Sequence, residues 1–177
     1  MVYTRFRLSV TRAIVVVNAL VAPSAPLAQT ATVPQAASPA QSDRMVDQTF
    51  VREASAAGLS EVADAQKAIK MAKREDVRKA AQQLLTDHTA ANAKLKSLAE
   101  SKSLPLATSA AAPANAPAST GGDFDAQYVA AQIKAHENAI ALFKAEARDG
   151  RDTGLREFAS STLPTLEHHL SMMQGLD

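Results

Sequence analysis

The histidines are the residues of this chain whose chemistry can be placed first. Four occur among 177 residues, and two of them are adjacent in the stretch LPTLEHHLSMM at 163–173. Adjacent residues of a helix point about 100° apart, so at most one of this pair can face a given interior. An imidazole in an interior needs a partner, either a hydrogen-bonding group or a metal ion. The first question is therefore which histidines face inward and what they meet there.

The spacing of apolar residues places one strong polar residue in each of four seams. Apolar residues recur at intervals of three and four, which is typical of helices packed in a bundle. The clearest seam is Val77, Ala81, Leu84, His88, Ala91, Leu95 and Leu98. The residues that interrupt the four seams in this way are Glu61, His88, His136 and His169. His168 shares a face with Glu157 and Ser161 and should look outward.

Three imidazoles and a carboxylate form a sufficient ligand set for one Zn²⁺, Cu²⁺, Ni²⁺, Mn²⁺ or Fe²⁺ ion. Asp87 or Tyr128 would then support the ligands by orienting an imidazole. A buried polar group without a partner costs about 1–3 kcal/mol, so the four residues should meet each other, water or a metal. A metal-free hydrogen-bonded cluster is the alternative, and a misphased seam with some of them exposed is a second one.

Heights along the helices test whether the four residues can converge. At about 1.5 Å per residue, Glu61 and His88 each lie roughly 20 Å from a turn near Lys73. His136 lies about 21 Å and His169 about 28 Å from a turn near Gly150. His169 is thus expected one helical turn off the common level, and a kink at Pro164 could absorb the difference.

The elements that carry these residues are four helices, so the expected fold class is all-α, a four-helix bundle. We predict helices over 43–72, 75–101, 122–149 and 153–174. The uncharged stretch 103–121 reads as a linker of nineteen residues. Extended, it could span roughly 60 Å, against about 40 Å for the preceding helix. This long connection allows the second and third helices to run parallel, as in ferritin-like folds, or antiparallel after a folded-back loop.

The amino-terminal region reads as an export signal followed by a tether. Arg5, Arg7 and Arg12 precede a ten-residue apolar run and then small residues, which predicts a signal peptide over 1–28. Residues 29–42 read as a disordered tether, and 43–177 as the bundle. Without 1–28 the chain has 16 basic and 18 acidic side chains. We therefore expect no nucleic-acid partner and no polybasic lipid contact. No segment of the mature chain is long enough to span a membrane, and no cysteine occurs.

With these residues in place, the chain resembles the exported bacterial family known as domain of unknown function 4142, which is similar to ferritin-like four-helix bundles. The resemblance rests on DRMVDQTFVREASAAGLSEV at 43–62, LLTDHTAANAKLKSLA at 84–99, the helix at 124–150 and LREFASSTLPTLEHHLSMM at 155–173. It implies a periplasmic or envelope location, in some members with an outer-membrane label. Ferritin-like diiron sites use Glu-x-x-His, but Leu85 and Leu166 stand three residues before His88 and His169. A carboxylate-bridged diiron centre is therefore not expected.

Three functional hypotheses remain open at this point. The first is a periplasmic binding protein that holds one transition-metal ion, with a role in stress protection or metal handling. The second is a metal-free interaction or structural module of the cell envelope. The third is a metal-dependent redox enzyme, although no nucleophile setting or phosphate loop is recognisable, and we lean against an enzyme. Protein partners and oligomeric state do not follow from the sequence.

Overall fold

The computed structural model describes residues 39–110 and 123–177, and these contain four α-helices. The helices are α1 (Pro39–Met71), α2 (Glu75–Ser101), α3 (Phe124–Asp149) and α4 (Thr153–Gln174). The described part contains no strand, which confirms the all-α fold class. None of the described helices is both long and apolar enough to cross a membrane. The predicted signal peptide over 1–28, residues 29–38 of the predicted tether and residues 111–121 of the linker lie outside the described residues.

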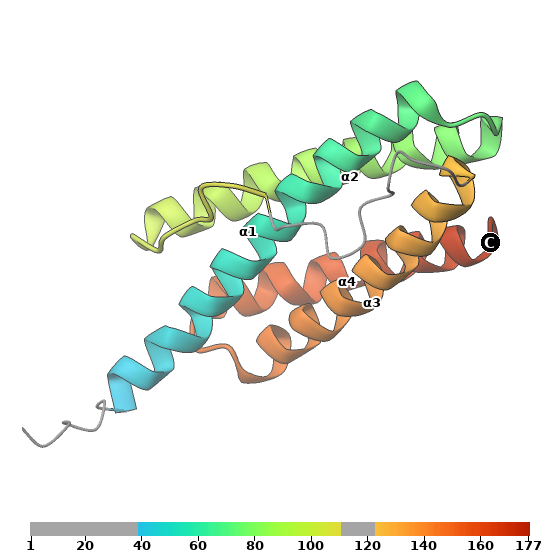
Figure 1. The fold of residues 1–177 in the computed structure, drawn as a ribbon. Helices are drawn as coiled ribbons and strands as arrows, with labels where there is room; N and C mark the ends of the chain where they lie inside the picture. Colours follow the sequence, from blue (N-terminus) through green and yellow to red (C-terminus); the bar gives the residue numbers. More distant parts are fainter. Residues whose placement is uncertain (1–38, 111–122) are drawn as a thin grey trace, which may run out of the picture. The chain divides into compact units, whose positions relative to one another are not determined.

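The four helices form two antiparallel hairpins, and the second and third helices run parallel (Figure 1). Within the bundle α1 packs against α2 and α3, while α4 packs against α3 and α2. The start of α3 lies at the α1–α2 turn, because the Asp125 carboxylate accepts hydrogen bonds from the backbone N–H groups of Lys73 and Arg74. Asp47, in the third turn of α1, lies at the α3–α4 turn, where its carboxylate accepts hydrogen bonds from the backbone N–H groups of Arg151 and Asp152. The end of α2 and the start of α3 therefore lie at opposite ends of the bundle.

The two hairpins repeat each other in these contacts. Asp125 lies 78 residues after Asp47, and Arg156 lies 78 residues after Arg78. The Arg78 guanidinium donates to the carbonyl of Ala72 at 2.8 Å, and that of Arg156 donates to the carbonyl of Gly150 at 3.0 Å. Each turn is thus held by an arginine of its own hairpin and an aspartate of the other one. The same spacing of 78 residues in both pairs of contacts shows that the two hairpins form an internal structural repeat.

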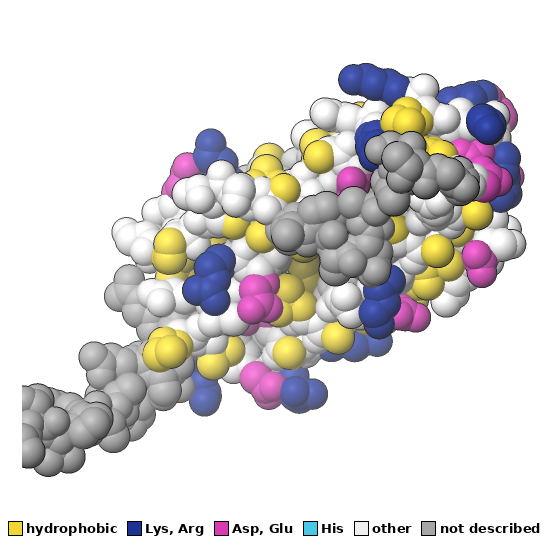
Figure 2. Space-filling view, in the orientation of Figure 1, with side chains coloured by type: hydrophobic (Ala, Val, Ile, Leu, Met, Phe, Trp, Pro, Cys, Tyr) yellow, Lys and Arg dark blue, Asp and Glu magenta, His cyan; other side chains and the backbone are white. Residues whose placement is uncertain are grey.

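The apolar core consists of two clusters, one toward each end of the bundle. One cluster contains Phe50, Leu95, Phe143 and Phe158, and the other contains Ala68, Leu84, Tyr128 and Met173. Along every helix the predicted polar residue falls between the parts that contribute to the two clusters. A buried polar layer therefore separates them. On the face shown in Figure 2, acidic and basic side chains are interspersed and no histidine is visible.

Three local features differ from the expectations. Helix α1 begins at Pro39, within the segment expected to be tether, because proline suits the first turn of a helix. Helix α4 continues through Pro164 without a break. The predicted linker is docked at its start, since Leu104 and Leu106 pack against the core. Its backbone is also held there, because the N–H of Ala107 donates to the hydroxyl of Ser55 at 2.8 Å.

Candidate metal centre

Three imidazoles meet in the polar layer of the bundle. The Nε2 atom of His136 lies 3.4 Å from Nε2 of His88 and 3.3 Å from Nδ1 of His169. The three donor atoms all lie within 4.8 Å of one another. The side chains are almost inaccessible to solvent, with exposures of 8%, 1% and 1% for His88, His136 and His169. His168 is exposed, as its position on the outer face of α4 predicts.

The orientation of two of these rings is set by their other nitrogen. Nδ1 of His136 lies 2.9 Å from the carbonyl of Gln132, which can only accept a hydrogen bond. Nε2 of His169 lies 2.8 Å from the Asp87 carboxylate. Each neutral ring therefore carries its proton on the nitrogen that faces away from the other ring and donates it to Gln132 or Asp87. Nε2 of His136 and Nδ1 of His169 then face each other with two lone pairs and no proton between them.

Burial keeps these rings neutral. It lowers the pKa of His88 to about 3, with a further contribution from the neighbouring His136 and His169. It lowers the pKa of His136 to about 4, against the effect of the hydrogen bond to Gln132. The pKa of His169 is also lowered by burial, although Asp87 opposes the shift. At neutral pH the cluster therefore offers lone pairs, which is the form that binds metal.

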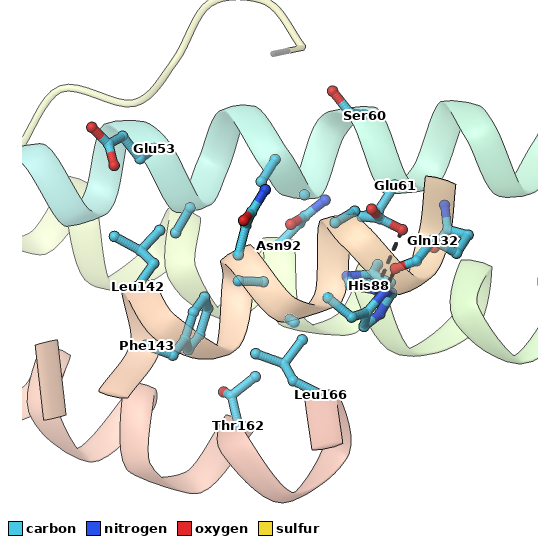
Figure 3. Close-up of a pocket in the computed structure, with 18 of the residues that line it drawn as sticks. Glu53, Ser60, Glu61, His88, Asn92, Gln132, Leu142, Phe143, Thr162 and Leu166 are labelled. Atoms are coloured by element: carbon cyan, nitrogen blue, oxygen red, sulfur yellow. Dashed lines mark hydrogen bonds and ion pairs between the residues drawn. The ribbon is translucent and has the colours of Figure 1, made fainter. Parts of the chain in front are cut away.

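Glu61 supplies the carboxylate of the layer from α1. Its Oε2 lies 3.9 Å from Nε2 of His88 and has no hydrogen-bond partner among the described residues (Figure 3). Burial, and secondly the charge on Asp64, raises the pKa of Glu61 to about 8, while a hydrogen bond from the Gln132 side chain opposes the shift. An oxygen left unpaired at this depth is poised for a cation or a ligand.

The two residues expected to support the ligands behave differently. Asp87 does orient an imidazole, as described for His169. Burial would raise the pKa of Asp87, but hydrogen bonds from Gln83 and His169 outweigh it and the pKa is lowered. Tyr128 is buried in an apolar cluster, and its hydroxyl has no hydrogen-bond partner among the described residues. Of the two alternatives, Asp87 is therefore the one that hydrogen-bonds to an imidazole in this structure.

His169 also departs from its expected height. From the rise along the two helix axes, His169 was expected one turn away from His136. Side chains of a helix tilt toward its amino terminus. Helix α4 runs away from the α3–α4 turn and α3 runs toward it, so the tilt moves the ring of His169 toward this turn and that of His136 away from it. The two rings approach one another for this reason.

The spacing of the donor atoms fits a single metal ion. Bonds of about 2.0–2.1 Å from Zn²⁺ to imidazole nitrogen imply about 3.3–3.4 Å between nitrogens in a tetrahedral site. The two shortest nitrogen pairs have this separation. The ligands come from three helices, and Glu61 comes from the fourth. The arrangement can hold a cation or, alternatively, form a strained cluster of neutral imidazoles.

A cavity of about 300 Å³ adjoins this cluster. Glu61, His88 and His136 are part of its wall, and Phe143 and Phe158 line it as well. Sequence reasoning missed this cavity. It also missed Gln132, whose carbonyl binds His136 and whose amide reaches Glu61. The available signal was that Gln132 stands one helical turn before His136 on the same face.

A four-helix bundle with a buried histidine cluster is the class that fold and site define. The chain belongs to the family described as "Domain of unknown function (DUF4142)", whose model matches residues 30–176. No curated protein sequence matches the chain.

Two solved structures share the fold. One is CopM in a Cu(I)-bound form, with a TM-score of 0.64 and 15% sequence identity. The other is CopM in an Ag-bound form obtained by co-crystallization, with a TM-score of 0.61 and 16% identity. Each match covers 73% of this chain and 93% of CopM. At this level of identity the likeness is one of fold.

Proposed function

We propose that this chain is an exported helical-bundle protein that binds one transition-metal ion and serves in metal handling. His88, His136 and His169 would bind the ion through Nε2, Nε2 and Nδ1, and Glu61 would be the fourth ligand. The observation that carries the proposal is the approach of two imidazole lone pairs to 3.3 Å in a buried layer. Without a cation or a proton between them these lone pairs repel each other.

The charges around the cluster suit a divalent ion. A buried cation must be balanced, because an isolated charge in a protein interior is costly. The carboxylates of Glu61 and Asp87 carry two negative charges when ionised, and the imidazoles contribute none. Asp87 reaches the ion through His169, which is the usual way in which a carboxylate supports a metal-bound imidazole. A monovalent ion would be balanced by Glu61 alone.

Copper is the first metal to test. Imidazole ligands suit copper, zinc, nickel and iron, and Cu²⁺ binds most tightly among the divalent ions of the first row. The fold shared with CopM, which was solved with Cu(I) and with Ag, supports the same choice. Export is supported by the signal-peptide pattern over 1–28. An envelope location would bring the chain into contact with incoming metal.

A titration of the purified chain with matched variants tests the proposal. Isothermal titration with Cu²⁺, Zn²⁺, Ni²⁺ and Ag(I), and with Cu(I) under reducing conditions, should give one equivalent for at least one ion. His88→Ala, His136→Ala and His169→Ala should each weaken that affinity by about 100-fold or more. His168→Ala is the control, since this histidine is adjacent in sequence but exposed.

Two results would contradict the proposal. One is the absence of stoichiometric binding for every ion. The other is an equal loss of affinity in His168→Ala and in the three core variants. Either result would favour the metal-free module, in which the polar layer only specifies helix packing.

A further inference from the structure

The cavity beside the histidine cluster occupies a defined place in the internal repeat. With the spacing of 78 residues, His136 and His169 correspond to Gly58 and Ala91, and Glu61 and His88 correspond to Ala139 and Leu166. All four of the corresponding residues line the cavity. The cavity therefore extends to the position that the repeat relates to the candidate centre, where Gly58, Ala91 and Ala139 are small and the side chain of Asn92 occupies the space beside Gly58.

The cavity leaves one side of the centre open. Its wall includes Glu61, His88 and His136 but not His169, which lies behind them on α4. The side-chain oxygens Glu61 Oε2 and Gln132 Oε1 have no hydrogen-bond partner in the described structure. Figure 3 shows Glu61, His88 and Gln132 gathered at one end, with Leu142 and Phe143 toward the other. Structural metal sites are closed by protein ligands, whereas sites that take external ligands keep an open position.

We propose that the bound metal accepts a fifth ligand from this cavity, in addition to the three imidazoles and Glu61, and that this ligand is a neutral molecule with one donor atom and an apolar body. This inference rests on the proposed function and adds the ligand class of the same site. The volume of about 300 Å³ lies at the lower end of the range for ligand pockets. About ten water molecules occupy this volume in liquid water, so the cavity suits a ligand of about ten non-hydrogen atoms.

The lining selects an apolar and uncharged body. Ala54, Leu95, Leu142, Phe143 and Phe158 supply apolar and aromatic walls. With a divalent ion bound, the charges of Glu53, Glu61, Asp64 and Lys134 and of the ion sum to zero, so the lining does not call for a charged ligand. A neutral nitrogen donor with an apolar body covers the apolar and aromatic walls, which azide leaves uncovered.

Absorption spectroscopy of the cobalt-loaded protein tests the inference. Co²⁺ takes nitrogen and oxygen ligands and reports a change of its ligands in its visible absorption bands. The probes are imidazole, 4-phenylimidazole and azide. We expect 4-phenylimidazole to change the spectrum with a Kd at least about tenfold lower than that of imidazole, because its phenyl ring is buried against Phe143 and Phe158. Azide should bind more weakly than 4-phenylimidazole, because it has no apolar body to bury.

Two cavity-filling variants complete the test. Ala57→Leu and Ala139→Leu place a larger side chain in the lining. Each should weaken 4-phenylimidazole binding about tenfold or more while Co²⁺ affinity stays within threefold. Ala63→Leu on the exposed side of α1 is the control and should change neither. If Ala139→Leu does not fold, Ala57→Leu carries the comparison.

The outcomes separate the two proposals. Co²⁺ binding with a spectrum that none of the probes changes would overturn the inference and leave the proposed function intact. Tighter binding of azide than of 4-phenylimidazole would overturn the ligand class. Failure of Co²⁺, together with the ions of the titration above, to bind at all would overturn the proposed function itself.

Discussion

Asp87 holds the ring of His169 by accepting from its Nε2, and Gln132 holds the ring of His136 through a backbone carbonyl. These two contacts decide which nitrogen of each ring faces the centre. The carbonyl belongs to the helix itself and cannot be lost by a side-chain substitution. Asp87 is a side chain on α2 and can be removed, so the orientation of His169 is open to a direct test.

Asp87→Ala should weaken metal binding by about 10–100-fold, because the imidazole of His169 loses the carboxylate that orients it and that balances charge. Competition with a chelator of known affinity measures the change. Glu100→Ala is the control, since Glu100 is an exposed carboxylate of the same helix that pairs with Lys96. Equal affinity in Asp87→Ala and the wild type would mean that Asp87 has no part in the centre.

Seam spacing was sufficient to place Glu61, His88, His136 and His169 inside, because the pattern of buried residues in a helix follows its period. All four are buried. The same reasoning could not find the role of Gln132. The contact between its backbone carbonyl and His136 depends on the rotamer of the histidine side chain. The contact between its side chain and Glu61 depends on the approach of α1 to α3. The residue type of Tyr128 suggested that it could orient an imidazole, but residue type does not determine the position of the hydroxyl group.

At the scale of elements, the ends of the helices were predictable where charge and capping residues mark them. Helix α2 begins with Glu75 and Asp76, and α4 is capped by Asp152, which accepts from the N–H of Leu155 at 3.0 Å. The predicted ranges for α2 and α4 agree with the structure. The docking of the segment after α2 was not predictable from its composition. It depends on the packing of Leu104 and Leu106 against the core beside α1.

The segment directly after α2 contains a strained residue that offers a stability test. Ser103 has a φ of 53°, in the left-handed region, and the following N–H of Leu104 bonds to the carbonyl of Ala99 at 2.9 Å. Glycine adopts this conformation without steric cost at such helix ends. Ser103→Gly should therefore raise the free energy of unfolding by about 0.5–1 kcal/mol, as measured by urea denaturation.

Ser109→Gly is the matched control for this element. It lies in the same segment, and Ser103 is the one non-glycine residue of the described chain with a positive φ. It should be neutral or slightly destabilising, since glycine only adds freedom to the unfolded chain. A loss of stability in Ser103→Gly would show that the serine side chain does more at this position than the backbone conformation requires.

At the scale of the whole molecule, the topology depends on contacts between distant parts of the sequence. Linker length allowed two arrangements, and the hydrogen bonds of Asp47 and Asp125 to opposite turns select the crossover. Such contacts are not encoded in local spacing, which is why composition and periodicity left the choice open. They also tie the two hairpins together at both ends of the bundle.

One of these ends contains a buried carboxyl that should make stability depend on pH. Glu146 is 2% exposed, and its carboxyl oxygens have no hydrogen-bond partner among the described residues. Burial, and secondly the charge on Asp47, raises its pKa from 4.5 to about 7. The folded state therefore keeps a proton that the unfolded state loses between these two values. Stability from this group is complete below pH 4.5 and is lost as the pH rises through 7.

Glu146→Gln removes this penalty because the amide carries no charge at any pH. The variant should be more stable than the wild type by about 1–2 kcal/mol at pH 8, and the difference should vanish or reverse at pH 4.5. Denaturation at both pH values measures it. Glu157→Gln, on the exposed face of α4, is the control and should show no such dependence. A constant difference across this range would mean that Glu146 is ionised in the folded protein.

The central claim is that imidazoles from α2, α3 and α4 bind the same ion. X-ray absorption spectroscopy of the copper- or zinc-loaded chain tests it most directly. Scattering from the outer atoms of the imidazole ring distinguishes histidine ligands from other nitrogen or oxygen ligands. The account predicts three imidazole nitrogens at about 2.0 Å with one further oxygen, and two imidazoles after His136→Ala. A metal shell without imidazole scattering, or one that His136→Ala leaves unchanged, would contradict it.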